Sequence, residues 1–187
     1  MRLRSFAIVF IFAWLCAQAA QAQPVVYLVR HAEKLPEWLG GEFDAHHPLS
    51  EAGVTRTQKL AEQFEKGALV AIYSSRTTRT LHTAMPLAQK LWLKVEIAPA
   101  CTDTSAMTSF FAELKKKYKP NEAVLLVSHS NIIPFLLIKA GLPKDCRKEM
   151  GIVVPDDSGD LMIEGYDGIW RIDLSREGCE AFTRKRY

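Results

Sequence analysis

Short apolar runs alternate with stretches of helical periodicity along most of this chain, and this alternation constrains the fold more than any other feature. Four apolar runs are typical of buried strands: residues 25–29, 69–75, 93–98 and 122–128. Apolar or small residues recur at helical spacing in four further segments: residues 50–67, 76–91, 104–118 and 131–141. Strands that alternate with helices in this way predict a mainly parallel sheet, with the helices as its connections.

Capping and turn residues indicate where several of these helices begin and end. Ser50 is a typical helix N-cap, and Gly67 is expected to end the first helix. The third helix is expected to begin from Asp103 or Thr104, and the fourth to end at Gly141.

The C-terminal part of the chain has a different pattern. In DLMIEGYDGIWRIDL, residues 160–174, apolar and polar residues alternate on both sides of YDG, which is typical of a β-hairpin with a tight turn. This hairpin is expected to give the sheet an antiparallel edge. The chain of 187 residues is long enough for one compact domain, and no linker is visible. The expected fold is therefore an α/β fold, a three-layer α/β/α sandwich formed by residues 23–187.

The first 22 residues have the composition of a secretory signal. The basic MRLR precedes the apolar run SFAIVFIFAWLCA, and AQAAQA ends in the small-x-small pattern of a signal-peptidase site. We expect cleavage after Ala22 and a periplasmic or secreted mature protein. The alternative is an uncleaved N-terminal anchor, although the apolar run is short for a membrane span. No second run of spanning length follows, so no membrane span is expected in the mature chain.

The charge of the mature chain excludes some classes of partner. Loss of Arg2 and Arg4 with the signal leaves 22 basic and 21 acidic residues, a net charge of +1. A chain so nearly neutral has no broad nucleic-acid-binding footprint. The basic runs at residues 115–117 and 184–186 are more typical of solvated faces than of binding patches.

Three cysteines remain once the signal is removed: Cys101, Cys146 and Cys179. An oxidising compartment favours one disulfide and one free thiol, and the sequence leaves all three pairings open. The cysteine spacing does not match a CxxC zinc pattern, so no structural metal is expected.

Basic and hydroxyl side chains stand where three of the predicted strands end: Arg30 and His31, then Arg76 and Arg79, then Ser128, His129 and Ser130. The carboxyl ends of parallel strands meet at one edge of a sheet, and ligands bind there. Arginine forks match the oxygens of a phosphoryl group, and helix N-termini add backbone N–H donors. The sequence therefore predicts a concave, cationic site for a phosphoryl group at this edge.

Three segments, LVRHAEK, YSSRTTRTLHTA and VLLVSHSN, resemble in order and spacing the signature segments of the histidine phosphatase superfamily, also called the phosphoglycerate mutase-like family. Together with HPLSEAG, the resemblance extends from about residue 25 to residue 142. Within the superfamily the chain most resembles small exported bacterial members. The resemblance implies that His31 is a nucleophile that becomes phosphorylated. It also implies that Arg30 and Arg79 are pocket arginines and that His129 contacts the phosphoryl group.

Elementary chemistry agrees with these roles. An imidazole attacks phosphorus only through an unprotonated nitrogen, and two nearby guanidiniums are expected to lower the pKa of His31. The same cations stabilise the charge that spreads over the phosphoryl oxygens in the transition state. Neither a metal nor a cofactor is therefore expected.

The proton donor for the leaving group stays open. Related branches carry a glutamate after the third strand or an aspartate directly after the second histidine. In this chain the first stretch reads PACTDTSAM, and Ser130 stands at the second position. Asp103 is the first candidate and Glu33 the second. Arg76, in SSRT where many relatives have SSPL, is an additional cation that could contact substrate.

The expected function is an exported, metal-independent phosphatase that hydrolyses a phosphomonoester or phosphoanhydride through a phosphohistidine on His31. Its expected partner is a small phosphorylated substrate. The alternatives are a phosphomutase of the same superfamily and a non-catalytic phosphoryl-binding module. The natural substrate and the oligomeric state stay open. So does the role of residues 34–48, which form either a lid or an ordinary packed loop.

Overall fold

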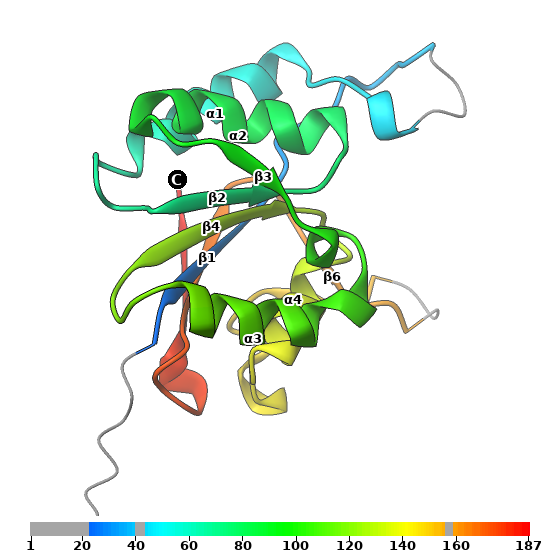
Figure 1. Cartoon of the computed structure of the whole chain (residues 1–187). Coiled ribbons are helices and arrows are strands. Elements are labelled where there is room, and N and C mark those ends of the chain that lie inside the picture. The colour runs from blue at the N-terminus through cyan, green and yellow to red at the C-terminus, as the bar shows by residue number, and fades with distance from the viewer. Residues whose placement is uncertain (1–22, 40–43, 156–158) are drawn as a thin grey trace, which may run out of the picture.

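A computed structural model describes residues 23–39, 44–155 and 159–187 (Figure 1). The predicted signal, residues 1–22, lies outside the described residues. The strands and α-helices are β1 (Val25–Arg30), α1 (Glu51–Glu62), β2 (Ala71–Ser74), α2 (Thr78–Leu91), β3 (Val95–Ile97), α3 (Met107–Lys117), β4 (Ala123–Ser128), α4 (Ile133–Lys139), β5 (Ile152–Val153), β6 (Met162–Ile163), β7 (Gly168–Asp173) and β8 (Phe182–Arg186). Short 3₁₀ helices are η1 (Asp44–His46), η2 (Pro99–Cys101), η3 (Thr104–Ala106), η4 (Lys144–Cys146) and η5 (Cys179–Ala181).

The main sheet has the strand order β3-β2-β4-β1-β7-β8. The first four of these strands are parallel to one another, whereas β7 and β8 run antiparallel to their neighbours. Helices α1 and α2 cover one face of the sheet, and α3 and α4 cover the other (Figure 1). The predicted three-layer α/β/α fold with a mainly parallel sheet is therefore confirmed.

The antiparallel edge is built from other strands than the sequence predicted. The hairpin predicted over residues 160–174 does not form, because β6 pairs with β5 in a separate two-stranded sheet. Strand β7 instead pairs with β1 on one side and β8 on the other. Its residues Ile169, Trp170 and Ile172 are buried, although they point alternately to both faces of the sheet. A strand that is buried on both faces lies inside a sheet, with a partner strand on each side. Strands β1 and β8 are long enough to pair with β7 along its length, whereas β6 has only two residues.

The predicted start of the first helix is correct, whereas α3 begins at Met107, after a 3₁₀ turn, and α4 ends at Lys139, before Gly141. Ser50 caps α1, and its hydroxyl accepts a hydrogen bond from the Gly53 amide. Asp103 caps the 3₁₀ turn that leads into α3. The first helix ends at Glu62, earlier than predicted, and Gly67 forms a later turn with φ of 83°. A glycine in a left-handed conformation thus marks the loop after the helix and not the helix end.

Two apolar clusters hold the three layers together. One fills the space between the sheet and the pair α1 and α2, and it includes Val29, Leu60, Ile72, Leu87 and Leu125. The other lies between the sheet and the pair α3 and α4, and it includes Leu28, Met107, Leu126, Ile133 and Trp170. Strands β1, β2, β4 and β7 contribute side chains to both clusters, so the middle of the sheet is buried on both faces.

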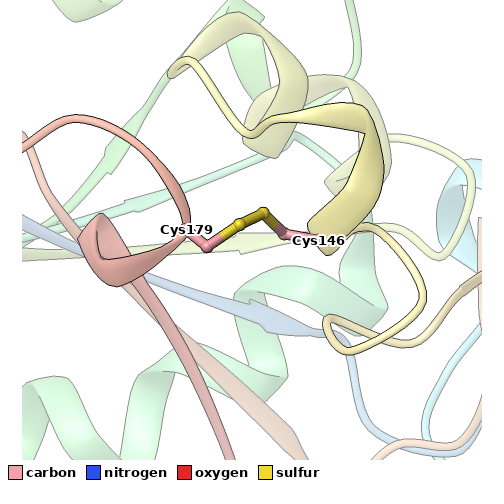
Figure 2. The surroundings of a disulfide bond; sticks show 2 residues. All are labelled: Cys146 and Cys179. Carbon is pink, nitrogen blue, oxygen red and sulfur yellow. A yellow bond between two sulfur atoms is a disulfide. The ribbon is translucent and has the colours of Figure 1, made fainter.

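One disulfide joins the C-terminal part of the chain to the end of the helical region. It links Cys146 in η4 to Cys179 in η5, across 33 residues (Figure 2). Cys101 is a buried free thiol. The structure thus selects one of the three pairings that the sequence left open. Among the described residues, no helix is long and apolar enough to cross a membrane.

Candidate active site

The register of the parallel strands brings the two predicted histidines together. Arg30 lies opposite Ser128 in the pairing of β1 with β4, and the His31 amide donates to the Ser128 carbonyl at 2.9 Å. His31 and His129 therefore leave neighbouring strands at the same level. Their rings are buried, and the ring centroids lie 5.3 Å apart.

Arg79 connects the two histidines. It is the second residue of α2, the helix that follows β2, and its side chain is buried. The Nε–H of Arg79 donates to His31 Nε2 at 3.3 Å, and its Nη2 lies 3.5 Å from His129 Nδ1. The predicted cluster of His31, Arg79 and His129 at the carboxyl edge of the sheet is thus present in the structure.

The hydrogen bonds of His31 determine which of its nitrogens is nucleophilic. His31 Nδ1 lies 2.8 Å from the backbone carbonyl of Ala32. A carbonyl only accepts hydrogen bonds, so the proton of the neutral ring is on Nδ1. The Nε2 atom, which receives the Arg79 hydrogen bond, then carries the free lone pair. The unprotonated nitrogen thus faces the arginine that the sequence assigned to the pocket.

His129 is oriented in the opposite sense. Its Nδ1 faces Arg79, which can only donate, so Nδ1 carries the lone pair. Its Nε2–H donates to the hydroxyl of Ser75 at 3.0 Å, and that hydroxyl is also 2.7 Å from the hydroxyl of Thr80. Ser75 was not predicted as a site residue, although it lies in the YSS segment that located Arg79.

Burial is the largest cause of the lowered pKa values of both histidines. It lowers the pKa of His31 to about 3, with further contributions from the repulsion by His129 when that ring is protonated and by the charges of Arg79 and Arg30. The hydrogen bond to the Ala32 carbonyl opposes this shift. Burial and Arg79 lower the pKa of His129 to about 4. The sequence predicted the direction for His31 but attributed it to the guanidiniums, whose contribution is the smaller one.

Arg30 is held by a segment far away in the sequence. Its Nη1 donates to the Gly165 carbonyl at 3.0 Å, and its guanidinium lies 4.0 Å from the centre of the Tyr166 ring. The same ring lies 6.0 Å from the His31 ring. Tyr166 was not predicted as a site residue, because nothing in the local pattern of residues 160–174 connects it with β1.

Asp44, in η1, is a carboxylate that the sequence analysis missed. Its Oδ2 accepts from Arg79 Nη2 at 2.8 Å, and its backbone carbonyl accepts from Arg79 Nη1 at 2.6 Å. Lys34 and His47 each approach Oδ1 at 3.8 Å. Partial burial opposes ionisation, but Arg79 and these two neighbours outweigh it and keep the pKa of Asp44 below its usual range.

The two predicted acids have other partners. The Nε–H of Arg56 in α1 donates to both carboxylate oxygens of Glu33, at 2.7 and 2.8 Å, and Nη2 of Arg56 donates to Oε1. Burial opposes ionisation of Glu33, but these bonds and the charge of Arg56 keep its pKa low. The exposed carboxylate of Asp103 caps η3, accepting from the amide and hydroxyl of Ser105 at 2.8 and 2.7 Å. Arg76 is exposed in the turn between β2 and α2. Neither carboxylate is therefore bonded to the cluster of His31, Arg79 and His129.

The arrangement suits a tetrahedral oxyanion. Arg30 and Arg79 supply positive charge and N–H donors, and two neutral imidazoles turn lone pairs toward the same place. Within the described parts of the chain, no group of three or more His, Cys, Asp or Glu side chains could hold a metal ion. The described residues thus offer a cationic site with a nucleophilic nitrogen.

Fold and site together define an α/β protein with paired histidines and arginines at the carboxyl edge of its parallel strands. Residues 26–106 match the model of the histidine phosphatase superfamily (branch 1). In this segment, which includes His31 and Arg79, the chain is similar to the histidine phosphatase superfamily.

Several solved structures share the fold. A mycobacterial glucosyl-3-phosphoglycerate phosphatase superposes with a TM-score of 0.61 at 17% identity, with 87% of this chain and 97% of that chain covered. The protein histidine phosphatase SixA, complexed with tungstate, gives a TM-score of 0.58 at 18% identity, with 86% and 94% covered. A comparison with curated proteins found no significant match.

Proposed function

We propose that this protein is a phosphatase that hydrolyses a phosphomonoester or phosphoanhydride through a phosphohistidine on Nε2 of His31. One observation carries the proposal: the lone pair of a buried, neutral imidazole faces Arg79 next to a second neutral imidazole. Among the structures with this fold, the mycobacterial phosphatase has been solved with inorganic phosphate and SixA with tungstate. Both ligands are oxyanions, the class of ligand that this site suits.

In the first step, Nε2 of His31 attacks phosphorus while Arg30 and Arg79 bind the phosphoryl oxygens. The Nε2–P bond forms and the bond from phosphorus to the leaving oxygen breaks. The ring then carries a proton on Nδ1 and phosphorus on Nε2, so it is cationic. The Ala32 carbonyl, which accepts from Nδ1, stabilises that charge. In the second step water attacks phosphorus and the ring leaves as neutral imidazole.

The contributions of the chain to this reaction are positioning and charge. Guanidiniums that bind the phosphoryl oxygens when the substrate enters need no further reorganisation in the transition state. The hydroxyl of Ser75 holds His129 in the tautomer whose lone pair points at Arg79. No step of the proposed reaction requires a metal or a cofactor.

The decisive experiment is substitution of the nucleophile. His31→Ala is expected to lower phosphate release from p-nitrophenyl phosphate by at least 10³-fold, because covalent catalysis is lost. His82→Ala, at an exposed position of α2, is the matched control and is expected to keep wild-type activity. Rapid acid-free quenching should trap an acid-labile, alkali-stable phosphoryl group in the wild type only. Retained activity in His31→Ala would contradict the mechanism. Oxyanion binding without turnover in the wild type would indicate a binding module.

We also propose that the protein is exported. The signal-like composition of residues 1–22 supports this, and so does the disulfide between Cys146 and Cys179, since disulfides persist in oxidising compartments. Fractionation of cells that express the full chain, followed by N-terminal sequencing, is expected to recover a form that begins at Gln23. A cytoplasmic form that begins at Met1 would contradict the proposal.

A further inference from the structure

The proposed reaction lacks a proton donor for its leaving group. An alkoxide is a poor leaving group, so hydrolysis of an alkyl phosphate needs an acid beside the ester oxygen. Glu33 is bound to Arg56 of α1, and Asp103 caps an exposed turn. Neither of these two carboxyl groups is bonded to the pocket, so the other carboxyl groups near the pocket are the next candidates.

Asp44 is the carboxyl group that contacts the phosphoryl pocket itself. Arg79 contacts both histidines and Asp44. Its Nε–H donates to His31, and its Nη2 lies near His129 and donates to the Asp44 carboxylate. Its Nη1 donates to the backbone carbonyl of Asp44. The Asp44 side chain is 62% exposed, whereas that of Arg79 is 9% exposed. The carboxylate thus lies on the solvent side of the arginine, which is the side from which a substrate enters and its leaving group departs.

We propose that Asp44 donates the proton to the leaving-group oxygen, an inference that rests on the phosphatase reaction proposed above. In the free protein the carboxylate occupies donors of Arg79 that a phosphoryl oxygen would also use. When a substrate dianion binds, Asp44 loses this partner and gains a negative neighbour. Both changes raise the affinity of the carboxyl group for a proton, which it takes from solvent as substrate binds.

The proton then moves in a balanced cycle. As the Nε2–P bond forms and the P–O ester bond breaks, the Asp44 proton passes to the ester oxygen, and the alcohol leaves. In the second step the Asp44 carboxylate takes a proton from the water whose oxygen attacks phosphorus. The N–P bond breaks, its electron pair returns to Nε2, and phosphate departs with Asp44 protonated again.

The charged groups around Asp44 set the pH range of this cycle. Arg79 faces it from α2, while Lys34 and His47 face it from the loop on either side of η1. All three groups favour the carboxylate when they are positively charged. Asp44 therefore becomes protonated during turnover only when the substrate replaces it as the hydrogen-bond acceptor of Arg79.

The test compares two esters that differ in leaving group. The ratio kcat/KM reports every step up to departure of the leaving group, so it is insensitive to the second step. With p-nitrophenyl phosphate, whose phenolate leaves without help, Asp44→Asn is expected to change kcat/KM by less than about 5-fold. With glycerol 2-phosphate, an alkyl ester, the same variant is expected to lose about 10²- to 10³-fold. Asp145→Asn, an exposed aspartate of η4, is the matched control and should leave both values unchanged.

Each other outcome overturns the proposal. An equal loss with both esters would assign Asp44 a positioning role, and an equal gain would show that it only competes with substrate for Arg79. A loss confined to the alkyl ester in Asp103→Asn or Glu33→Gln, but not in Asp44→Asn, would move the acid to that residue. If the wild type hydrolyses neither ester, the phosphatase proposal fails, and with it the role of Asp44. The activity of the wild type therefore tests the first proposal, and the comparison with the variant tests the second.

Discussion

His31 and His129 combine burial with hydrogen bonds that specify one tautomer each. Each ring donates to a fixed acceptor, the Ala32 carbonyl or the Ser75 hydroxyl, and turns its other nitrogen toward Arg79. Burial disfavours the imidazolium form of both rings. Together these features keep nucleophilic nitrogens available at neutral pH, but they make the folded protein sensitive to acid.

The first prediction concerns this sensitivity. An unfolded histidine takes up a proton near pH 6.5, whereas His31 and His129 resist protonation in the folded protein down to about pH 3 and 4. Between these values the unfolded state binds more protons, so the free energy of unfolding falls as the pH falls below 6.5. Each histidine contributes up to about 1.4 kcal/mol per pH unit in this window. Urea unfolding at pH 7, 6, 5 and 4.5 measures the slope.

Two sets of variants test whether His31 and His129 cause the fall in the free energy of unfolding at low pH. His31→Asn with His129→Asn is expected to flatten the slope, because neither position then takes up a proton in the unfolded chain. His82→Asn, on the exposed face of α2, is expected to keep the wild-type slope. A double variant as acid-sensitive as the wild type would show that other groups control acid unfolding.

At the scale of the element, α1 fixes the segment that follows His31. The Ser50 amide donates to the Glu33 carbonyl at 2.9 Å, and Arg56 binds the Glu33 carboxylate. Gly53, in the first turn of α1, lies so close that a Cβ atom there would be 2.2 Å from the Glu33 carbonyl oxygen. Backbone atoms at the start of α1 thus pack directly against the backbone of Glu33, two residues after His31.

The second prediction follows from this contact. Gly→Ala inside a helix normally stabilises a protein by up to about 1 kcal/mol. Gly53→Ala is expected instead to destabilise the fold by about 1–3 kcal/mol, because backbone atoms of Glu33 must move. The shift reaches His31, so phosphatase activity should fall as well. Thermal unfolding and activity assays check both effects, with Gln58→Ala on the exposed face of α1 as control. A stabilised Gly53→Ala protein would contradict the prediction.

The sequence predicted those parts of the site that depend on the ends of elements. Arg30, His31 and His129 directly follow apolar strands, and parallel register necessarily places them at one edge. Asp44 and Tyr166 reach the same place from a loop and from a late segment whose paths are set by tertiary packing. The alternation around YDG identified β6 and β7 but not their partners, because a period of two says which side chains share a face and not which strand lies alongside.

At the scale of the whole molecule, the part of the chain after α4 folds back over the first half. Strand β7 pairs with β1, Gly165 and Tyr166 hold Arg30, and the Cys146–Cys179 disulfide ties this return path at both ends. The segment closed by the disulfide includes β5, β6 and β7. The bond therefore limits the freedom of the same residues that complete the site.

The third prediction concerns this bond. Cys146→Ala with Cys179→Ala is expected to lower the free energy of unfolding by about 3–4 kcal/mol, as the chain-entropy account gives for a loop of this length. Because the loop carries Gly165 and Tyr166, KM for p-nitrophenyl phosphate should rise. Differential scanning calorimetry with and without reductant checks the first effect. Reductant should destabilise the wild type and leave the double variant unchanged. A double variant as stable as the oxidised wild type would contradict the prediction.

The position of β1 between β4 and β7 has a consequence for the order of events during synthesis. On a ribosome or in a translocation channel the chain emerges from its N-terminus, so β1 and β4 are present long before β7. Until residues 168–173 pair, β1 is an open sheet edge, and Arg30 still lacks Gly165 and Tyr166. An unfinished chain therefore has the proposed nucleophile, His31, but not the complete pocket. Catalysis is expected to begin only after the last strands have emerged.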